Sequence, residues 1–325
     1  MRSRVGQSSA PGRSPAAPRP LVGVVVVLLA LGAAPARADD GLVSVDTRWA
    51  AAAPGALTLV RGAHVPAHLD VLLGLDLEYL RRPLVVTDRA LGARHDVVGS
   101  RLGASLVWGV GLFDSLELSL GFPIVLSQAG DGRSVLTGLP SDELQSAVVG
   151  DLRLGVAWAL PRGLRATSAA TFVNVSLPTG TETSLAGEPG VVLEVGACGE
   201  LHVGPLRVLA ELALRARGRR PLGPTEIGTQ IVAASAVSVA LLDRRLDLAL
   251  EARGLAGVDP GTPVPLEVAV SARGRPGEDR KLELSLSVGA GLDEAALSPA
   301  LRVVAGLRYT SPSRGPGSRD TEPAP

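Results

Sequence analysis

The chain is poor in several features on which common protein classes depend. Cysteine occurs once, at Cys198, so no intramolecular disulfide can form. Aromatic residues make up only 2% of the chain, which argues against aromatic platforms that stack bases or sugars. Basic and acidic residues are equal at 32 each, and no basic stripe stands out, so nucleic-acid binding is not expected.

Long apolar runs are also scarce. Leu21–Leu31 is apolar, follows an arginine-rich start and precedes Ala36-Arg37-Ala38, which fits a cleavage site before Asp39. The run is shorter than the ~20 residues of a spanning helix, so we predict a cleavable signal peptide over residues 1–38 and an exported protein. Its removal takes away five arginines and no acid, which leaves 27 basic and 32 acidic residues, a net charge of −5.

What the chain does have is alternation of apolar and polar residues in short segments. Over Ala67–Tyr79, leucine, valine and tyrosine side chains occupy every second position, and Asp70, Asp76 and Glu78 lie between them. A period of two predicts an extended strand whose two faces meet different environments. Such a strand belongs either to a soluble sheet over a core or to a membrane barrel with a polar interior.

The same alternation predicts twelve strands in all. Two stretches, Leu206–Arg217 and Leu241–Leu255, are also rich in helix-forming residues, and we assign them as strands because their neighbours are strands and the alternation persists. The predicted strands are Ala67–Tyr79, Arg101–Val110, Leu116–Phe122, Asp151–Leu160, Leu164–Leu177, Val191–Val203, Leu206–Ala216, Ile227–Leu241, Leu246–Ala252, Leu266–Ala272, Leu282–Val288 and Leu301–Tyr309.

The connections between these strands alternate between long and short. The gap from Leu80 to Ser100 is long, Gly111–Ser115 is tight, Pro123–Gly150 is long, and only Gly274–Arg280 departs from the pattern. Outer-membrane barrels sort their connections in this way, with short periplasmic turns and longer external loops, whereas a soluble sandwich has no reason to do so. An even strand number also places both ends of the barrel on the periplasmic side.

We therefore predict an all-β, transmembrane, antiparallel up-and-down barrel of about twelve strands. The expected organisation is a signal peptide (1–38), an N-terminal periplasmic segment (39–63), the outer-membrane barrel (64–310) and a disordered tail (311–325). The segment before the first strand could dangle, plug the lumen or form a short helix. The alternative is a soluble secreted or periplasmic β-rich binding protein.

Several short motifs resemble those of one group of barrels. They are Pro83-Leu84-Val85, Gly150-Asp151-Leu152-Arg153-Leu154-Gly155, Leu177-Pro178-Thr179-Gly180, Pro265-Leu266-Glu267 and Gly306-Leu307-Arg308-Tyr309. Over roughly Ala63–Thr310 the chain resembles the barrels of myxobacterial-type outer-membrane proteins, classed with the outer-membrane protein A family or with transporter-type barrels. Relatives often continue into a peptidoglycan-binding domain that has no counterpart here, so a wall-anchoring role is not implied.

Charged residues of both signs fall on the face that the barrel would turn inward. They predict either a selectivity lining or a set of ion pairs that fills the interior, and we favour the ion pairs because an unpaired buried charge is costly. Barrels of about eight strands are packed and those of sixteen or more hold water, so a narrow or closed lumen is expected. The predicted lumen-lining residues are Asp70, Asp76, Glu78, Arg101, Glu117, Arg153, Glu194, Glu200, Arg207, Glu211, Arg215, Glu251, Arg253, Glu267, Arg273, Glu283, Arg302 and Arg308.

No catalytic, metal or cofactor site is predicted. His64 and His68 share a predicted strand face, but Pro66 lies between them and no third ligand converges on them. His202 has no serine two positions away, as a barrel lipase would need, and Cys198 is expected to be a buried, inert thiol. The expected partners are outer-membrane lipid, the barrel assembly machinery during insertion and small solutes. The expected role is structural or a narrow passage for small solutes.

Overall fold

The computed structural model describes residues 43–87, 93–132, 134, 144–161, 166–222, 225–259, 262–277, 280–293 and 296–311. All of them belong to one compact unit, Pro35–Pro325. The predicted signal peptide and nearly all of the predicted tail lie outside the described residues. Among the helices described, none is long and apolar enough to cross a membrane.

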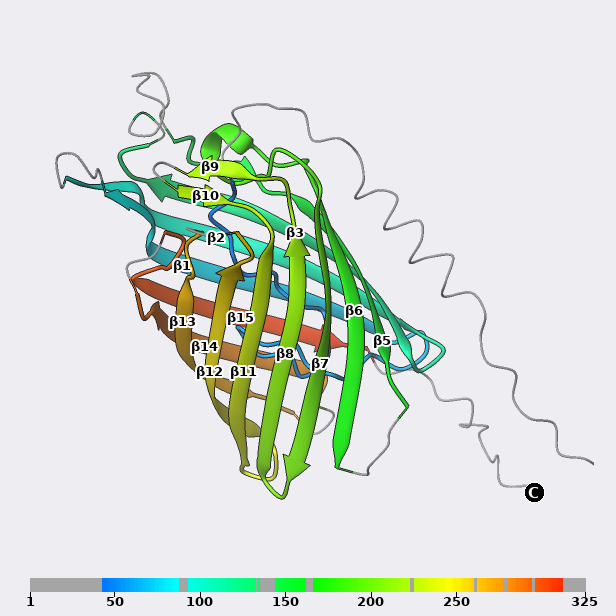
Figure 1. Cartoon of the computed structure of the whole chain (residues 1–325). Helices are drawn as coiled ribbons and strands as arrows, with labels where there is room; N and C mark the ends of the chain where they lie inside the picture. The colour runs from blue at the N-terminus through cyan, green and yellow to red at the C-terminus, as the bar shows by residue number, and fades with distance from the viewer. Residues whose placement is uncertain are drawn as a thin grey trace, which may run out of the picture. The chain divides into compact units, whose positions relative to one another are not determined.

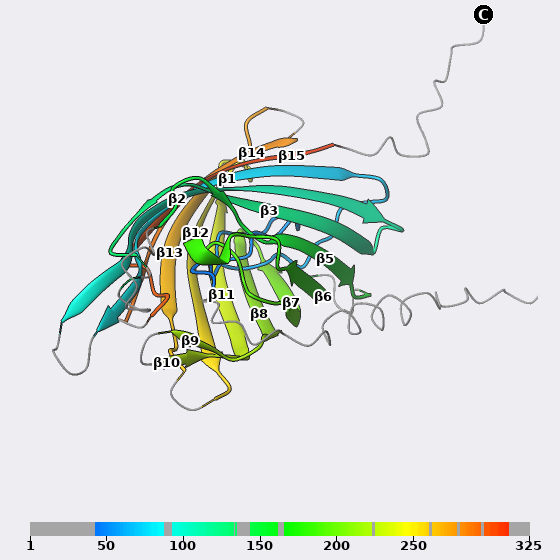
Figure 2. The ribbon, with the colours of Figure 1, turned by 90° about the horizontal axis from the view of Figure 1, so that it is seen from above.

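Twelve antiparallel strands of the described chain close into a barrel (Figures 1 and 2). Each barrel strand pairs with its neighbour in the sequence, and the pairing of β1 with β15 closes the ring. The barrel strands are β1 (Val71–Thr87), β2 (Arg94–Leu112), β3 (Leu116–Ala129), β5 (Leu152–Ala159), β6 (Thr167–Leu177), β7 (Val192–Val203), β8 (Leu206–Ala216), β11 (Gln230–Leu241), β12 (Leu246–Gly257), β13 (Leu266–Gly274), β14 (Leu282–Gly291) and β15 (Leu301–Thr310). The predicted fold class and strand number are confirmed.

Three shorter strands and one turn of helix lie in the connections. The two residues of β4 (Val148–Val149) pair with β3, and β9 (Arg220–Leu222) forms a small hairpin with β10 (Thr225–Ile227). The 3-10 turn η1 (Glu182–Ser184) lies between β6 and β7. These elements cover one end of the barrel, and Figure 2 looks down on them.

The alternation in the sequence becomes alternation between the lumen and the outer wall. Along β11, Gln230, Val232 and Ala234 are buried, whereas the intervening Ile231 is 44% exposed and Val237 further along is 51% exposed. The helix-prone segments β8 and β12 show the same period, because pairing with strands on both sides outweighs a weak helix propensity. The barrel therefore has an apolar outer wall and a mixed interior.

The first hairpin differs from the prediction at both of its ends. Residues 67–70 are not part of β1, because Leu69 has a φ of 63° and so departs from the extended conformation. The region between Leu80 and Ser100, predicted to be a long connection, is largely strand, since β1 and β2 continue to Thr87 and from Arg94. Register shifts after Arg81 mark where the regular alternation ends, which explains why it was missed.

The connections divide the barrel into two ends. One end carries the connections β2–β3, β5–β6, β7–β8, β11–β12 and β13–β14, and is called the short-turn end; the opposite end is called the long-loop end. The start of β1 lies at the short-turn end beside the end of β15, where Leu72 pairs with Thr310. Both ends of the barrel wall therefore lie on the same side.

Residues 43–63, called the interior segment, lie inside the ring of strands, where Figures 1 and 2 show them as a blue trace. Val43 and Val45 pack against Leu185 and Leu222 at the long-loop end, and Ala63 contacts Glu200 near the short-turn end. The segment thus runs the length of the lumen before the chain enters β1. Of the three placements left open, the structure shows the plug for residues 43–63.

Candidate functional site

Ion pairs hold the interior segment to the middle of the barrel wall. Arg48 contacts Asp76 (Nη1 to Oδ2, 3.0 Å) and Glu78 (Nε to Oε1, 3.1 Å), both on β1. Arg61 contacts Glu117 on β3 (Nη2 to Oε1, 2.7 Å), and the side chain of Glu117 is completely buried. Because such pairs lie away from water, losing one partner would leave an uncompensated charge inside the barrel.

Carboxylates of the wall also satisfy the backbone of the interior segment. The N–H of Leu59 donates to Oε2 of Glu251 (2.6 Å), and the N–H of Arg61 donates to Oε2 of Glu211 (2.8 Å). The N–H of Ala63 donates to Oε2 of Glu200 (3.2 Å). Residues 57–63 are irregular in structure, so the wall supplies the hydrogen bonds that a helix or sheet would otherwise provide.

Small inward side chains make room for the apolar part of the interior segment. Leu57, Leu59 and Val60 pack in one buried cluster with four alanines of the wall, Ala234, Ala236, Ala249 and Ala269. Larger residues at those four positions would fill the space themselves. The inward side chains of the wall therefore leave space in the lumen, and the interior segment fills that space.

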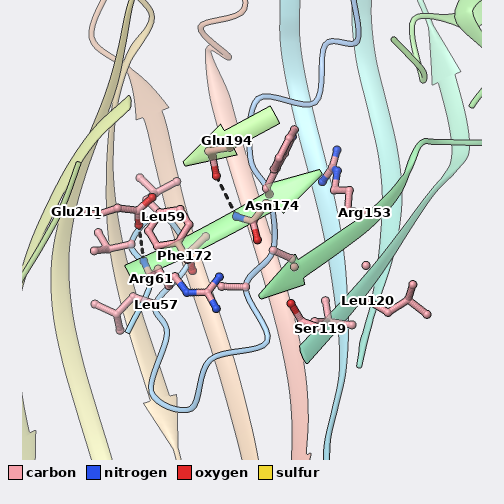
Figure 3. Close-up of a pocket in the computed structure, with 18 of the residues that line it drawn as sticks. Leu57, Leu59, Arg61, Ser119, Leu120, Arg153, Phe172, Asn174, Glu194 and Glu211 are labelled. Atoms are coloured by element: carbon pink, nitrogen blue, oxygen red, sulfur yellow. Dashed lines mark hydrogen bonds between the residues drawn. The ribbon is translucent and has the colours of Figure 1, made fainter. Parts of the chain in front are cut away.

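At mid-height the lumen is almost completely filled. Figure 3 shows this level, with Arg61 of the interior segment beside Phe172 and with Asn174 donating to Glu194. The guanidinium of Arg215 lies 4.4 Å from the ring centroid of Trp49. The cavity that remains among these side chains is about 40 Å³, which holds little more than one or two waters.

An apolar cluster closes the long-loop end. Val43 and Val45 of the interior segment meet side chains from β1, β2, the β9–β10 hairpin and the loops after β6 and β14. The β6–β7 loop (residues 178–191) reaches over the lumen, and the carbonyl oxygen of its Leu185 accepts a hydrogen bond from the N–H of Val45 (3.2 Å). Arg101 also donates to the carbonyl oxygens of Ser184 and Leu185. This end is sealed by side chains and by a loop.

Asp151 ties the β6–β7 loop to the start of β5. Its Oδ1 accepts from the N–H of Gly180 (2.9 Å) and its Oδ2 from the N–H of Glu188 (2.8 Å). Burial, aided by the nearby carboxylate of Glu188, raises the pKa of Asp151 to about 6, although the two backbone hydrogen bonds oppose the shift. The anchor of this loop therefore changes protonation near physiological pH.

The short-turn end is open by comparison. A cavity of about 530 Å³, called the vestibule, lies between the turns of this end and the Pro54-Gly55 turn of the interior segment. Four acidic side chains line it, among the residues described, together with His64 and His202. Its basic lining residues are Arg207, Arg244, Arg275, Arg280, Lys281 and Arg308. The vestibule is therefore polar and carries an excess of basic side chains.

The structure buries or half-buries all eighteen residues that the sequence analysis placed on the lumen. Twelve are buried, and Asp70, Glu78, Arg153, Arg207, Glu211 and Glu283 are partly exposed. Asp70 precedes β1 and lines the vestibule instead of belonging to a strand. All the others project from barrel strands.

Many of these side chains pair with one another across neighbouring strands. Arg215 contacts Glu194 (2.6 Å) and Arg207 contacts Glu200 (2.7 Å). Arg273 contacts Asp247 (3.2 Å), an inward carboxylate that the sequence analysis did not include. Arg302 joins Glu267 and Glu78. Arg153 and Arg308 contact Asp46 and Asp76, and Arg253 lies buried near Glu211 and Glu194 around the mid-lumen cavity. The inward charges therefore form a paired network around the interior segment.

His64 and His68 are not grouped as a strand pattern would place them, whereas Cys198 is buried on β7 as expected. His64 contacts Glu200 (3.3 Å), whereas His68 stacks on Phe113 and accepts from its N–H (3.2 Å), so the two do not share a strand face. Cys198 is buried, and its thiol donates to the carbonyl oxygen of Gly62 (Sγ to O, 3.5 Å). The thiol thus touches the interior segment.

The sequence analysis did not identify the residues of the interior segment that contact the barrel wall. Asp46, Arg48 and Arg61 lie in a stretch otherwise rich in alanine and small apolar residues, with no periodicity. Their signal was indirect: charged residues in a segment that lacks a strand or helix pattern need partners elsewhere. The inward alanines of β11, β12 and β13 were a second signal, because they leave space in the lumen.

The fold is similar to that of a solved outer-membrane channel. The COG4313 outer membrane channel from Pseudomonas putida F1 is similar with a TM-score of 0.61 and 15% identity, over 79% of this chain and 99% of that one. The NanC porin (TM-score 0.49, 8% identity, 73% and 98% covered) and the KdgM porin in complex with disordered oligogalacturonate (0.46, 8%, 74% and 98%) are more distant and support no inference. No family model and no curated protein matches the sequence.

Proposed function

We propose that the protein is a narrow outer-membrane channel for small solutes whose lumen is closed by its own interior segment. The observation that carries the proposal is the occupant of the lumen. A chain segment held by ion pairs and hydrogen bonds fills a charged interior, and an open vestibule lies below it. A barrel with a purely structural role could fill its lumen with side chains of the wall alone.

The outer wall supports a membrane location. Leu212, Leu250 and Val270 are each 61% exposed and lie on strands whose other outward residues are also apolar. A continuous apolar wall of this kind suits hydrocarbon and does not favour the soluble alternative. The wall carries few aromatic girdle residues, with Trp108, Phe122 and Tyr309 on one side around β1. Lipid and the barrel assembly machinery are accordingly the proposed partners.

We further propose that the short-turn end faces the periplasm, as in outer-membrane barrels generally. Export would follow removal of residues 1–38, and the barrel would extend over residues 64–310. Twelve strands exceed the eight of outer-membrane protein A-type barrels, so the resemblance to transporter-type barrels fits better. Ser168 Oγ lies 3.5 Å from Nε2 of His64, and Nδ1 of His64 lies 3.3 Å from Glu200. Arg207 also holds this carboxylate, and we propose no enzymatic activity.

Conductance across a planar bilayer tests the proposal. The mature chain should stay closed for most of the recording, because the mid-lumen cavity is too small for a hydrated ion. A variant lacking residues 39–63 should give discrete conductance steps. Heat-dependent migration on a denaturing gel would check that the variant is folded. A folded deletion variant that never conducts would assign the barrel a structural role instead.

A further inference from the structure

Three arginines of the barrel wall converge on one turn of the interior segment. Arg207 of β8 donates to the carbonyl oxygen of Gly55 (Nη2 to O, 2.8 Å). Arg273 of β13 and Arg308 of β15 donate to the carbonyl oxygen of Ala56, at 3.2 Å and 3.3 Å from their Nη1 atoms. Three positive guanidinium groups are thus directed at two neutral oxygen atoms.

The segment Ala53–Ala56 is a tight turn that contacts the arginines only through its carbonyl oxygens. The N–H of Ala56 donates to the carbonyl oxygen of Ala53 (3.1 Å), and Gly55 has a φ of 74°, as the third residue of a type II turn requires. No ion pair is described for residues 50–57, so this stretch meets the wall only through backbone carbonyl oxygens and apolar contacts. It differs in this from Arg48 and Arg61 on either side, which form ion pairs with the wall.

The arginines retain hydrogen-bonding capacity that the turn does not use. Arg207 also contacts Glu200, Arg308 contacts Asp76, and Arg273 contacts Asp247 and Glu283. The buried Nε atoms of Arg273 and Arg308 nevertheless have no hydrogen-bond partner within the described chain. An unpaired buried N–H is costly, and a ligand with several oxygen atoms would satisfy more of these donors than a single carbonyl does.

The vestibule gives access to this cluster from the short-turn end. Gly55, Arg207 and Arg308 all line it, and its volume of about 530 Å³ lies within the usual range for small-molecule sites. Among the described lining residues, six basic side chains face four acidic ones. Anions entering from this end therefore meet a net positive surface that leads to the turn.

We propose that Arg207, Arg273 and Arg308 form a binding site for the oxyanion group of a small organic anion, and that its binding releases the Ala53–Ala56 turn. Arginine pairs with carboxylate or phosphate through two parallel hydrogen bonds, and such charge-assisted bonds are about twice as strong as those to a neutral carbonyl. An anion that binds only when the turn has moved shifts the population toward the released state. Anion binding needs no channel activity; passage of the anion rests on the proposed function.

The native Cys198 reports release of the interior segment without any engineering. Its thiol contacts Gly62, so it should react slowly with N-ethylmaleimide while the segment is in place. The experiment measures this rate for the full mature chain in detergent, with succinate, inorganic phosphate or neutral succinamide at equal ionic strength. We expect succinate to raise the rate about tenfold in a saturable manner, and succinamide to leave it unchanged. A response to phosphate alone would support the site and identify the oxyanion as phosphate.

Matched variants separate the site from general loosening. R207Q/R308Q should abolish the response to anions. R101Q should keep it, because Arg101 donates to carbonyl oxygens of the β6–β7 loop at the opposite end of the lumen. Heat-dependent gel migration checks folding of both variants.

Gly55→Ala provides a test in the opposite direction. Alanine is strained at the positive φ of this position, and its Cβ would lie 3.1 Å from Nη2 of Arg207. The carbonyl oxygens of the turn should therefore compete less well with an anion for the arginines. We expect faster basal labelling and half-saturation at a lower succinate concentration. Equal effects of succinate and succinamide, or no effect of either anion on the intact chain, would overturn the proposal. None of these readouts depends on conductance, so failure of the site and failure of the channel are distinguishable.

Discussion

The two ends of the lumen are closed in different ways. At the long-loop end, Val43 and Val45 pack with apolar side chains from strands and loops, and the β6–β7 loop lies over them. At the short-turn end, the interior segment borders a polar vestibule of about 530 Å³, where it meets arginines through its carbonyl oxygens. Apolar packing excludes water and ions, whereas polar contacts can be exchanged for those of a solute. The long-loop end is thus closed by apolar packing, whereas at the short-turn end a solute can replace the polar contacts of the interior segment.

The largest effect is expected from the buried ion pair between Arg61 of the interior segment and Glu117 of β3. Arg61→Leu leaves the fully buried Glu117 without its partner, which costs about 3–5 kcal/mol for a buried pair. This cost destabilises the closed state, so the rate of Cys198 labelling should rise by about two to four powers of ten.

The double variant Arg61→Leu/Glu117→Leu is the matched control. Replacing both partners of a buried pair by apolar residues is often neutral, so most of the slow labelling should return. If Arg61→Leu labels as slowly as the natural chain, the ion pair does not hold the interior segment in place.

A pair of valine substitutions compares the ends directly. Val45→Ala removes two methyl groups from the apolar seal and should cost about 1.5–3 kcal/mol, from lost burial and the cavity left behind. Val65→Ala, near the short-turn end, should cost less than about 1 kcal/mol because Val65 is only partly buried. Denaturant-dependent labelling of Cys198 gives both values. Equal costs would contradict the proposed difference between the ends.

Acidity should tighten the long-loop end through Asp151. Its pKa is raised on folding to about 6, so the charged form destabilises the loop above pH 6, and this cost disappears as the pH falls toward the unfolded pKa of 3.8. Between pH 7.5 and pH 5 the gain is about 1.4 kcal/mol, or roughly tenfold in the opening equilibrium. Hydrogen exchange of residues 178–191, corrected for its intrinsic pH dependence, should slow by that factor. In Asp151→Asn the slowing should vanish, and its persistence would assign the effect to another group.

The strands of the barrel wall could be predicted from the sequence because their pattern is local. Each strand alternates between lipid and lumen, so a period of two was sufficient to locate β8 and β12 in spite of their helix-forming residues. The rule failed where the backbone departs from regular pairing, at Leu69 and beyond Arg81. At Leu69 the alternation continues although the backbone is not yet a strand, and beyond Arg81 the strand continues although the alternation has ended.

The interior of the barrel could be predicted only in part. The inward direction of residues such as Glu117 and Glu251 follows from the strand pattern, but their contacts with Arg61 and Leu59 do not. Those contacts join irregular residues of the interior segment to strands more than 50 positions away, and no local pattern records such a pairing. The alanines at inward positions of β11–β13 indicated free space, yet not what fills it.

Labelling of single cysteines from each side of a membrane tests the central claim most directly. In a Cys198→Ser background, one cysteine replaces Ser44, which is buried beside the apolar seal, and another replaces Ala240, which lines the vestibule. With the barrel inserted in one orientation in vesicles, a membrane-impermeant thiol reagent should label the Ala240 position rapidly from the short-turn side. It should leave the Ser44 position unlabelled from either side. Labelling of the Ser44 position as fast as that of Ala240 would show that the long-loop end is not sealed.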